Sequence, residues 1–171
     1  KSGGAKEVAA TLTKRPARKV TASKKKRGTV VENGLAEIPG AKKSAASDAF
    51  FKPELATLRE HPPLGDDWLH EVKWDGYRIL TTIAEGKVQL WSRNALSWTD
   101  KIPDIRQAIE SLGLTSAQLD GELIALREGN ADFNALQQTL SGERSSPLVY
   151  MLFDVPYLEG YDLTRASLLD R

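Results

Sequence analysis

The most reactive combination of side chains in the sequence lies in the stretch Glu-Val-Lys-Trp-Asp-Gly-Tyr-Arg, which runs from Glu71 to Arg78. Lys73 ends a short apolar run, where partial desolvation would favour a neutral amine that attacks carbonyl or phosphorus centres. Gly76 permits a tight turn in which backbone approaches a ligand. Arg78 follows on the next expected strand, where its guanidinium can bind phosphate or ribose oxygens. The stretch therefore predicts a nucleophile beside an anion site, with a solvated hairpin end as the alternative.

The elements that must position these side chains are short strands rich in β-branched and aromatic residues, interspersed with two helices. Because strands and helices do not alternate regularly, the pattern predicts an α+β fold with antiparallel sheets and packed helices. We expect strands over residues 68–73, 77–84, 87–92, 117–127 and 148–155, the first three forming a meander, and helices over 104–112 and 131–140.

The charge distribution divides the chain in two. The net charge of +1 combines a segment of +9 over residues 1–47 with a segment of −8 over residues 48–171. Residues 1–47 contain no Phe, Trp or Tyr, so they bury little apolar surface and we expect a disordered basic tail or interdomain linker. Its cluster Lys24, Lys25, Lys26 and Arg27 either solubilises the chain or binds nucleic-acid phosphates in a salt-sensitive way.

Composition excludes several classes of protein. The chain has no cysteine and only two histidines, so a disulfide framework, a Cys zinc site and a His metal cluster are not expected. His70 receives no role, because a single histidine at a strand end is more often structural than catalytic. No apolar run reaches the length of about 18 residues that a membrane helix needs, and no secretory signal is recognisable. We therefore expect a cytoplasmic protein without a membrane partner.

Four motifs follow one another in an order typical of one enzyme superfamily. Lys73-x-Asp-Gly-x-Arg78 resembles the nucleophile motif of the covalent nucleotidyltransferases, which comprise DNA ligases, RNA ligases and mRNA-capping enzymes. Ser-Arg93-Asn, Asp-Gly-Glu122-Leu and Phe153-Asp resemble the three motifs that come next. The segments around Phe51, Pro62 and Tyr157 narrow the resemblance to the ATP-dependent ligase domain of the bacterial non-homologous end-joining DNA ligase D family, over about residues 50–171.

The resemblance implies a role for each motif residue. Lys73 would attack the α-phosphate of ATP and form lysyl-AMP, and AMP would then pass to a DNA 5′-phosphate before the nick is sealed. Glu71 and Val72 would edge the adenine pocket, and Phe153 would stack on adenine. For Glu71 the alternative is an ordinary edge-strand charge, and for Phe153 it is a core position.

The remaining motif residues would handle phosphates and metal. Arg78 would bind ribose or the phosphate of the nick, with a strand salt bridge as the alternative. Arg93 would bind phosphate and touch DNA, unless it is a solvated loop arginine. Glu122 would hold a ribose hydroxyl or a Mg²⁺ (or Mn²⁺) ion, because hard cations prefer oxygen ligands. Asp120 would form the turn or support the site.

The family's later motifs, including a Lys-x-Lys strand and an OB-fold, do not occur after Phe153. We therefore expect residues 48–171 to be the N-terminal part of an adenylation domain, as a partial nucleotidyltransferase (ATP-grasp-like) fold, with little sealing activity alone. The implied partners are nicked or broken double-stranded DNA, the Ku end-binding protein and the polymerase and phosphoesterase domains of a nucleoid-associated parent. The alternatives are an RNA ligase or capping-type nucleotidyltransferase, and a non-catalytic nucleic-acid-binding module.

Overall fold

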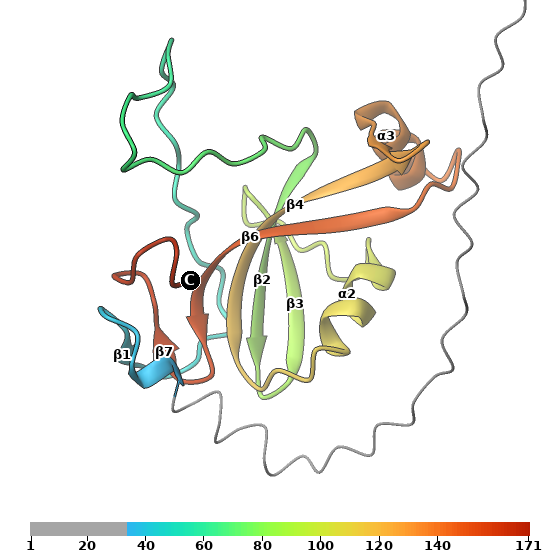
Figure 1. The fold of residues 1–171 in the computed structure, drawn as a ribbon. Helices are drawn as coiled ribbons and strands as arrows, with labels where there is room; N and C mark the ends of the chain where they lie inside the picture. The colour runs from blue at the N-terminus through green and yellow to red at the C-terminus, as the bar shows by residue number, and fades with distance from the viewer. Residues whose placement is uncertain (1–33) are drawn as a thin grey trace, which may run out of the picture.

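The computed structural model describes residues 34–171, and its centre is one curved antiparallel sheet (Figure 1). The strands lie in the order β1-β7-β6-β4-β2-β3, and β5 pairs separately with the far end of β4. Every paired neighbour is antiparallel, as expected for an α+β fold. The elements are β1 Lys42–Lys43, β2 Tyr77–Ala84, β3 Lys87–Ser92, α2 Pro103–Glu110, β4 Ala117–Arg127, β5 Asn130–Ala131, α3 Phe133–Ser141, β6 Leu148–Leu158 and β7 Tyr161–Asp162.

Local sequence explains most of these bounds. β2, β3 and β4 have the predicted limits, and β6 runs three residues further than predicted. Helix α3 begins after Asp132, whose carboxylate accepts a hydrogen bond of 2.9 Å from the Ala135 amide, and ends at Gly142 with φ 80°. Helix α2 begins one residue earlier than predicted, at Pro103, because proline suits the first helical position.

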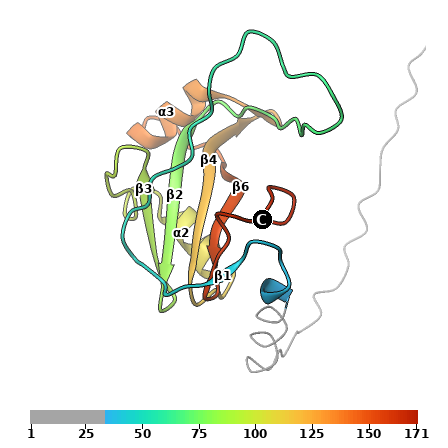
Figure 2. The same cartoon turned by 90° about the vertical axis from the view of Figure 1, so that its left-hand side faces the viewer.

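The predicted strand over residues 68–73 is wrong. These residues belong to a long loop without regular structure, which extends away from the sheet (Figure 2). Trp68, Leu69 and Val72 are all more than half exposed, so the apolar side chains that suggested a strand do not contact the core. The second neighbour of β2 is therefore β4 rather than the predicted meander strand.

The expected disordered tail also differs from the structure over residues 34–47. Leu35 is buried against Tyr161, Leu163 and Ala166, and β1 pairs with β7. Leu35, with Ile38 and Ala41 packed beside it, and a two-residue strand fix this segment, and neither is visible in its charged composition. The rest of the expected tail, with the cluster Lys24, Lys25, Lys26 and Arg27, lies outside the described residues.

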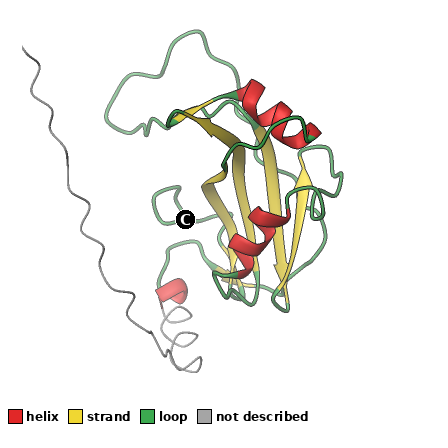
Figure 3. Cartoon of the chain, turned by 90° about the vertical axis from the view of Figure 1, so that its right-hand side faces the viewer, coloured by secondary structure: helices red, strands yellow, loops and turns green. Residues whose placement is uncertain are grey.

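Helices α2 and α3 pack against one face of the sheet (Figure 3). Their apolar residues Ile105, Ile109 and Leu136 share a core with the inward side chains of β2 and β4, such as Ile79 and Leu123. Because side chains alternate along a strand, the residues between these project from the opposite face. That face is left free of helices for a site. No helix of the described residues combines the length and apolarity required to span a membrane.

Candidate active site

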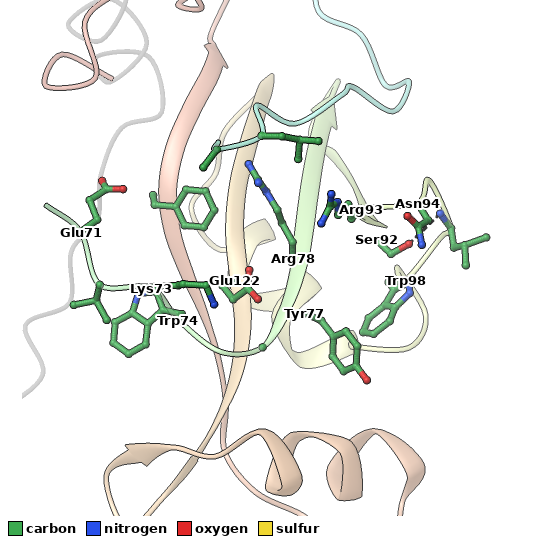
Figure 4. Close-up of a pocket in the computed structure, with 16 residues that line it drawn as sticks. Glu71, Lys73, Trp74, Tyr77, Arg78, Ser92, Arg93, Asn94, Trp98 and Glu122 are labelled. Atoms are coloured by element: carbon green, nitrogen blue, oxygen red, sulfur yellow. Dashed lines mark hydrogen bonds between the residues drawn. The ribbon is translucent and has the colours of Figure 1, made fainter. Parts of the chain in front are cut away.

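A cavity of about 870 Å³ opens on the face of the sheet opposite the helices (Figure 4). Loop residues before β2, the turn after β3 and side chains of β2, β4 and β6 form its wall. The structure thus brings together all the residues of the described chain that the motifs singled out for a nucleotide: Glu71, Val72, Lys73, Arg78, Arg93, Glu122 and Phe153.

Arg78 is held by a two-pronged ion pair. Its Nε donates to Asp120 Oδ1 at 2.9 Å and its Nη2 donates to Oδ2 at 2.6 Å. The Asp120 side chain is 3% exposed and the Arg78 side chain 22%. The hydrogen bond to Asp120 raises the pKa of Arg78, and burial opposes it. The strand salt bridge weighed as an alternative for Arg78 is therefore present, and it fixes the guanidinium within the cavity wall.

A β-bulge places Phe153 beside this pair. Asp120 lies opposite Asp154, but the next residue of β4, Gly121, lies opposite Leu152, so Phe153 is an extra residue on β6. Bulges redirect side chains near functional sites. Here the Phe153 ring lies 5.3 Å from the Arg78 Cζ atom and lines the cavity. Phe153 is only half-buried, in contrast to the core position weighed as its alternative.

Glu122 is the carboxylate at the centre of the wall. It lies opposite Arg78 in the β2–β4 register. Burial raises the pKa of Glu122, and the Gly76 backbone amide, Arg78 and Lys73 oppose the rise. Burial therefore outweighs the stabilisation of the carboxylate by the amide and the two cations.

Lys73 lies in the loop before β2, and its side chain extends toward Glu122 (Figure 4). The residue is exposed, so the desolvation expected from a strand end does not apply. Gly76 also lines the cavity. A Cβ atom at Gly76 would collide with the backbone oxygen of Leu123, so the glycine additionally lets the loop that carries Lys73 lie close to β4.

Arg93 lies on the turn that follows β3. The turn is closed by hydrogen bonds from Ala95 N to Ser92 O and from Ser92 N to Leu96 O, at 2.9 and 2.8 Å. Ala95 adopts a φ of 60° within this turn, and Arg93 lines the cavity. Within the described residues Arg93 forms no ion pair, so its charge is available to an anion.

The donor set suits a metal ion that is shared with phosphates. The described residues contain no group of three or more His, Asp or Glu side chains that could hold a metal by themselves. Glu122 is a single carboxylate, and Mg²⁺ commonly takes one or two protein carboxylates and completes its shell with water and substrate phosphates. The residues present therefore fit Mg²⁺ only together with a phosphorylated ligand.

Three features of the site were missed by sequence reasoning. Tyr77 and Trp98 line the cavity with ring centroids 5.3 Å apart, and Trp74 lines it from the loop that carries Lys73.

Arg171 donates to both oxygens of Asp154 at 2.8 and 2.6 Å, next to Phe153. Burial raises the pKa of Asp154, and Arg171 opposes the rise. Trp74 and Tyr77 lie within the motif around Lys73, so the sequence could have indicated that they line the site. Nothing in the sequence indicates that Arg171 pairs with Asp154.

The family model for the ATP-dependent DNA ligase domain matches residues 53–171, which include the whole cavity. The chain belongs to this family. It is 46% identical over 123 residues to the multifunctional non-homologous end joining protein LigD of Pseudomonas aeruginosa, which covers 71% of this chain and 14% of that protein. It is 34% identical over 142 residues to the protein of the same name from Mycolicibacterium smegmatis, covering 82% of this chain and 18% of that protein.

Among solved structures, the ligase domain resembles mycobacterial DNA ligase D complexed with ATP and MES. The TM-score is 0.49 at 31% identity, over 58% of this chain and 35% of that chain. The chain spans less than a fifth of the length of the Pseudomonas aeruginosa and Mycolicibacterium smegmatis proteins named above. The family assignment agrees with the resemblance drawn from the four motifs, and it favours a DNA ligase over the RNA-ligase and capping alternatives.

Proposed function

We propose that this ligase domain performs the first step of DNA ligation, in which Lys73 takes AMP from ATP. The Lys73 Nζ lone pair forms a bond to the α-phosphorus, the bond between that phosphorus and the β-phosphate oxygen breaks, and pyrophosphate leaves. The amine loses a proton and becomes a phosphoramidate. The observation that carries this proposal is that one cavity holds Lys73 together with Arg78, Glu122 and Phe153.

The charges of the cavity support this chemistry. Phosphoryl transfer depends mainly on positioning and on neutralising phosphate charge. Arg93 is free of ion pairs within the described residues and lies where it can bind a phosphate. Two nitrogens of Arg78 are engaged by Asp120, which leaves Nη1 for a ribose or phosphate oxygen. The exposed edge of Phe153 offers a ring for adenine, with Glu71 and Val72 at the rim.

A divalent cation would bind at Glu122 together with the phosphates. We propose Mg²⁺, with Mn²⁺ as a substitute, because both prefer oxygen ligands. When bound, the ion neutralises charge on the α-phosphate and on the departing pyrophosphate. Glu122 itself would orient the ion or a ribose hydroxyl, and its carboxylate would keep the Lys73 amine directed toward the cavity.

For the whole protein we propose nick sealing during double-strand break repair. The relatives carry non-homologous end joining in their names, and the family is one of DNA ligases. The substrates would be nicked or broken double-stranded DNA in the bacterial cytoplasm, and the partners would be Ku and polymerase or phosphoesterase domains. Residues 48–171 would act as the N-terminal part of the adenylation domain and seal little DNA alone, and the cluster Lys24, Lys25, Lys26 and Arg27 would add salt-sensitive affinity for DNA.

The test is detection of labelled AMP on the protein. The full-length gene product is incubated with α-labelled ATP and Mg²⁺ and separated on a denaturing gel. We expect label on the wild type and on Lys87→Ala, whose lysine lies on β3 outside the cavity, and none on Lys73→Ala. Label that persists in Lys73→Ala would refute the proposal. DNA affinity that is indifferent to Lys73 and no label on any variant would favour the non-catalytic binding module.

A further inference from the structure

Tyr150 crosses the sheet on the face opposite the cavity. It begins on β6, and its hydroxyl donates a hydrogen bond of 2.7 Å to the backbone oxygen of Ile79 on β2. The same hydroxyl accepts a bond of 3.2 Å from Thr81 Oγ1 and lies 3.4 Å from the backbone oxygen of Leu119 on β4. One side chain therefore connects three strands: its own strand β6, the adjacent β4, and β2 on the far side of β4.

Gly121 makes this crossing possible. A Cβ atom at Gly121 would lie 2.6 Å from Cε2 of the Tyr150 ring, well inside van der Waals contact. The glycine of the Asp-Gly-Glu motif therefore serves the passage of a tyrosine ring rather than a turn. The backbone oxygen of Met151 also excludes a larger residue at position 121, because it would lie 2.5 Å from the same Cβ atom.

The residues that Tyr150 binds are the chain neighbours of the ion pair. Ile79 directly follows Arg78, and Leu119 directly precedes Asp120. The ladder between β4 and β6 is irregular at this level, because of the bulge at Phe153. A bulge disrupts ladder hydrogen bonds. The tyrosine hydroxyl supplies a cross-strand connection at the level where the backbone ladder is interrupted.

We propose that Tyr150 is a positioning residue for the adenylation site. It ties β6 to the backbone beside Arg78 on β2 and beside Asp120 on β4, at the level where the β4–β6 ladder is interrupted, and thereby holds Arg78 and Asp120 in their two-pronged geometry on the other face. The effect on catalysis rests on the proposed function, whereas the effect on the Arg78 geometry does not. Loss of the hydroxyl loosens the guanidinium without removing any group from the cavity.

The first test measures Arg78 directly by nuclear magnetic resonance on this chain. In Tyr150→Phe, solvent exchange of the Arg78 Nε proton is expected to accelerate by about fivefold, the change that loss of one hydrogen bond typically permits. The matched control is Tyr157→Phe, on the same strand, whose hydroxyl donates at 3.1 Å to Ser44 O away from the site. The control is expected to leave the exchange unchanged. Equal exchange rates in Tyr150→Phe and the wild type, with both folded by circular dichroism, would overturn the proposal.

The second test is a kinetic cycle on the full-length gene product. Tyr150→Phe is expected to slow formation of lysyl-AMP by about fivefold in the wild-type background and by less than about twofold in Arg78→Gln, because residues that act through one another are not additive. The same factor in both backgrounds would show that Tyr150 acts only through general stability, and would overturn the proposal. If the wild type forms no lysyl-AMP, the proposed function fails, and the exchange measurement still decides the role of Tyr150.

Discussion

The ion pair between Arg78 and Asp120 gives a quantitative prediction for Asp120→Asn. Asparagine keeps the size of the side chain, but it removes the charge and turns an NH₂ group toward the guanidinium. Breaking a fully buried pair on one side typically costs about 3–5 kcal/mol. The Arg78 side chain is 22% exposed, so water can replace part of what it loses. We therefore expect the free energy of unfolding to fall by about 2–3 kcal/mol.

The assay is urea denaturation followed by circular dichroism. Native domains have free energies of unfolding of about 5–15 kcal/mol, so the variant should remain folded with a lower midpoint. The matched control is Asp100→Asn, whose carboxylate is 96% exposed and lies 3.5 Å from Arg106. Exposed pairs contribute about 0–1 kcal/mol, so this change should leave the midpoint nearly unaltered. If Asp120→Asn costs no more than Asp100→Asn, the two-pronged pair does not fix Arg78 as described.

Three further predictions concern the loop, the ring and the carboxylate of the site. Gly76→Ala should destabilise the domain by about 1–3 kcal/mol in urea unfolding, because the new Cβ meets Leu123 O, whereas Gly34→Ala, with open space around it, should change little. Phe153→Leu should weaken ATP binding about two- to tenfold in calorimetry with little loss of stability, because stacking contributes about 0.5–1.5 kcal/mol and the ring is half-exposed; unchanged affinity would contradict stacking. Burial raises the pKa of Glu122 above its ordinary 4.5, so the folded state holds the proton of this carboxyl group more tightly than the unfolded state does. The stability that comes from this difference is fully present below pH 4.5 and is lost as the pH rises through the raised pKa of the folded state. Glu122→Gln should remove that part of the pH dependence in urea midpoints, and an unaltered pH profile would refute it.

Several elements of the fold could be predicted because their signals are local. The β-branched alternation of residues 77–84 and the Asp132 cap of α3 depend only on neighbouring residues. The loop over residues 68–73 has the same apolar character, but no partner strand receives it, and a pattern of residue types does not reveal whether a partner exists. Leu35 illustrates the reverse case, since one buried leucine anchors a segment whose composition indicates disorder.

The candidate site shows the same division. The motifs predicted which residues share the cavity, because they specify residue types in a fixed order along the chain. They did not predict the partner of each residue. The pairing of Arg78 with Asp120, the bulge at Phe153 and the passage of Tyr150 beneath Gly121 all depend on strand register. A register shift of one residue moves every side chain to the other face, so such contacts appear only once the sheet is assembled.

The most direct test of the account is the reactivity of Lys73 in the nucleotide-loaded cavity. An acyl phosphate of ATP transfers its acyl group to whichever lysine amine lies beside the bound phosphates, and peptide mass spectrometry locates the label on this chain. We predict that Lys73 is labelled and that excess ATP protects it, while Lys87 on β3 reacts slowly and is not protected. If Lys73 reacts no faster than Lys87 and ATP does not protect it, the lysine does not face the phosphates, and the account is wrong at its centre.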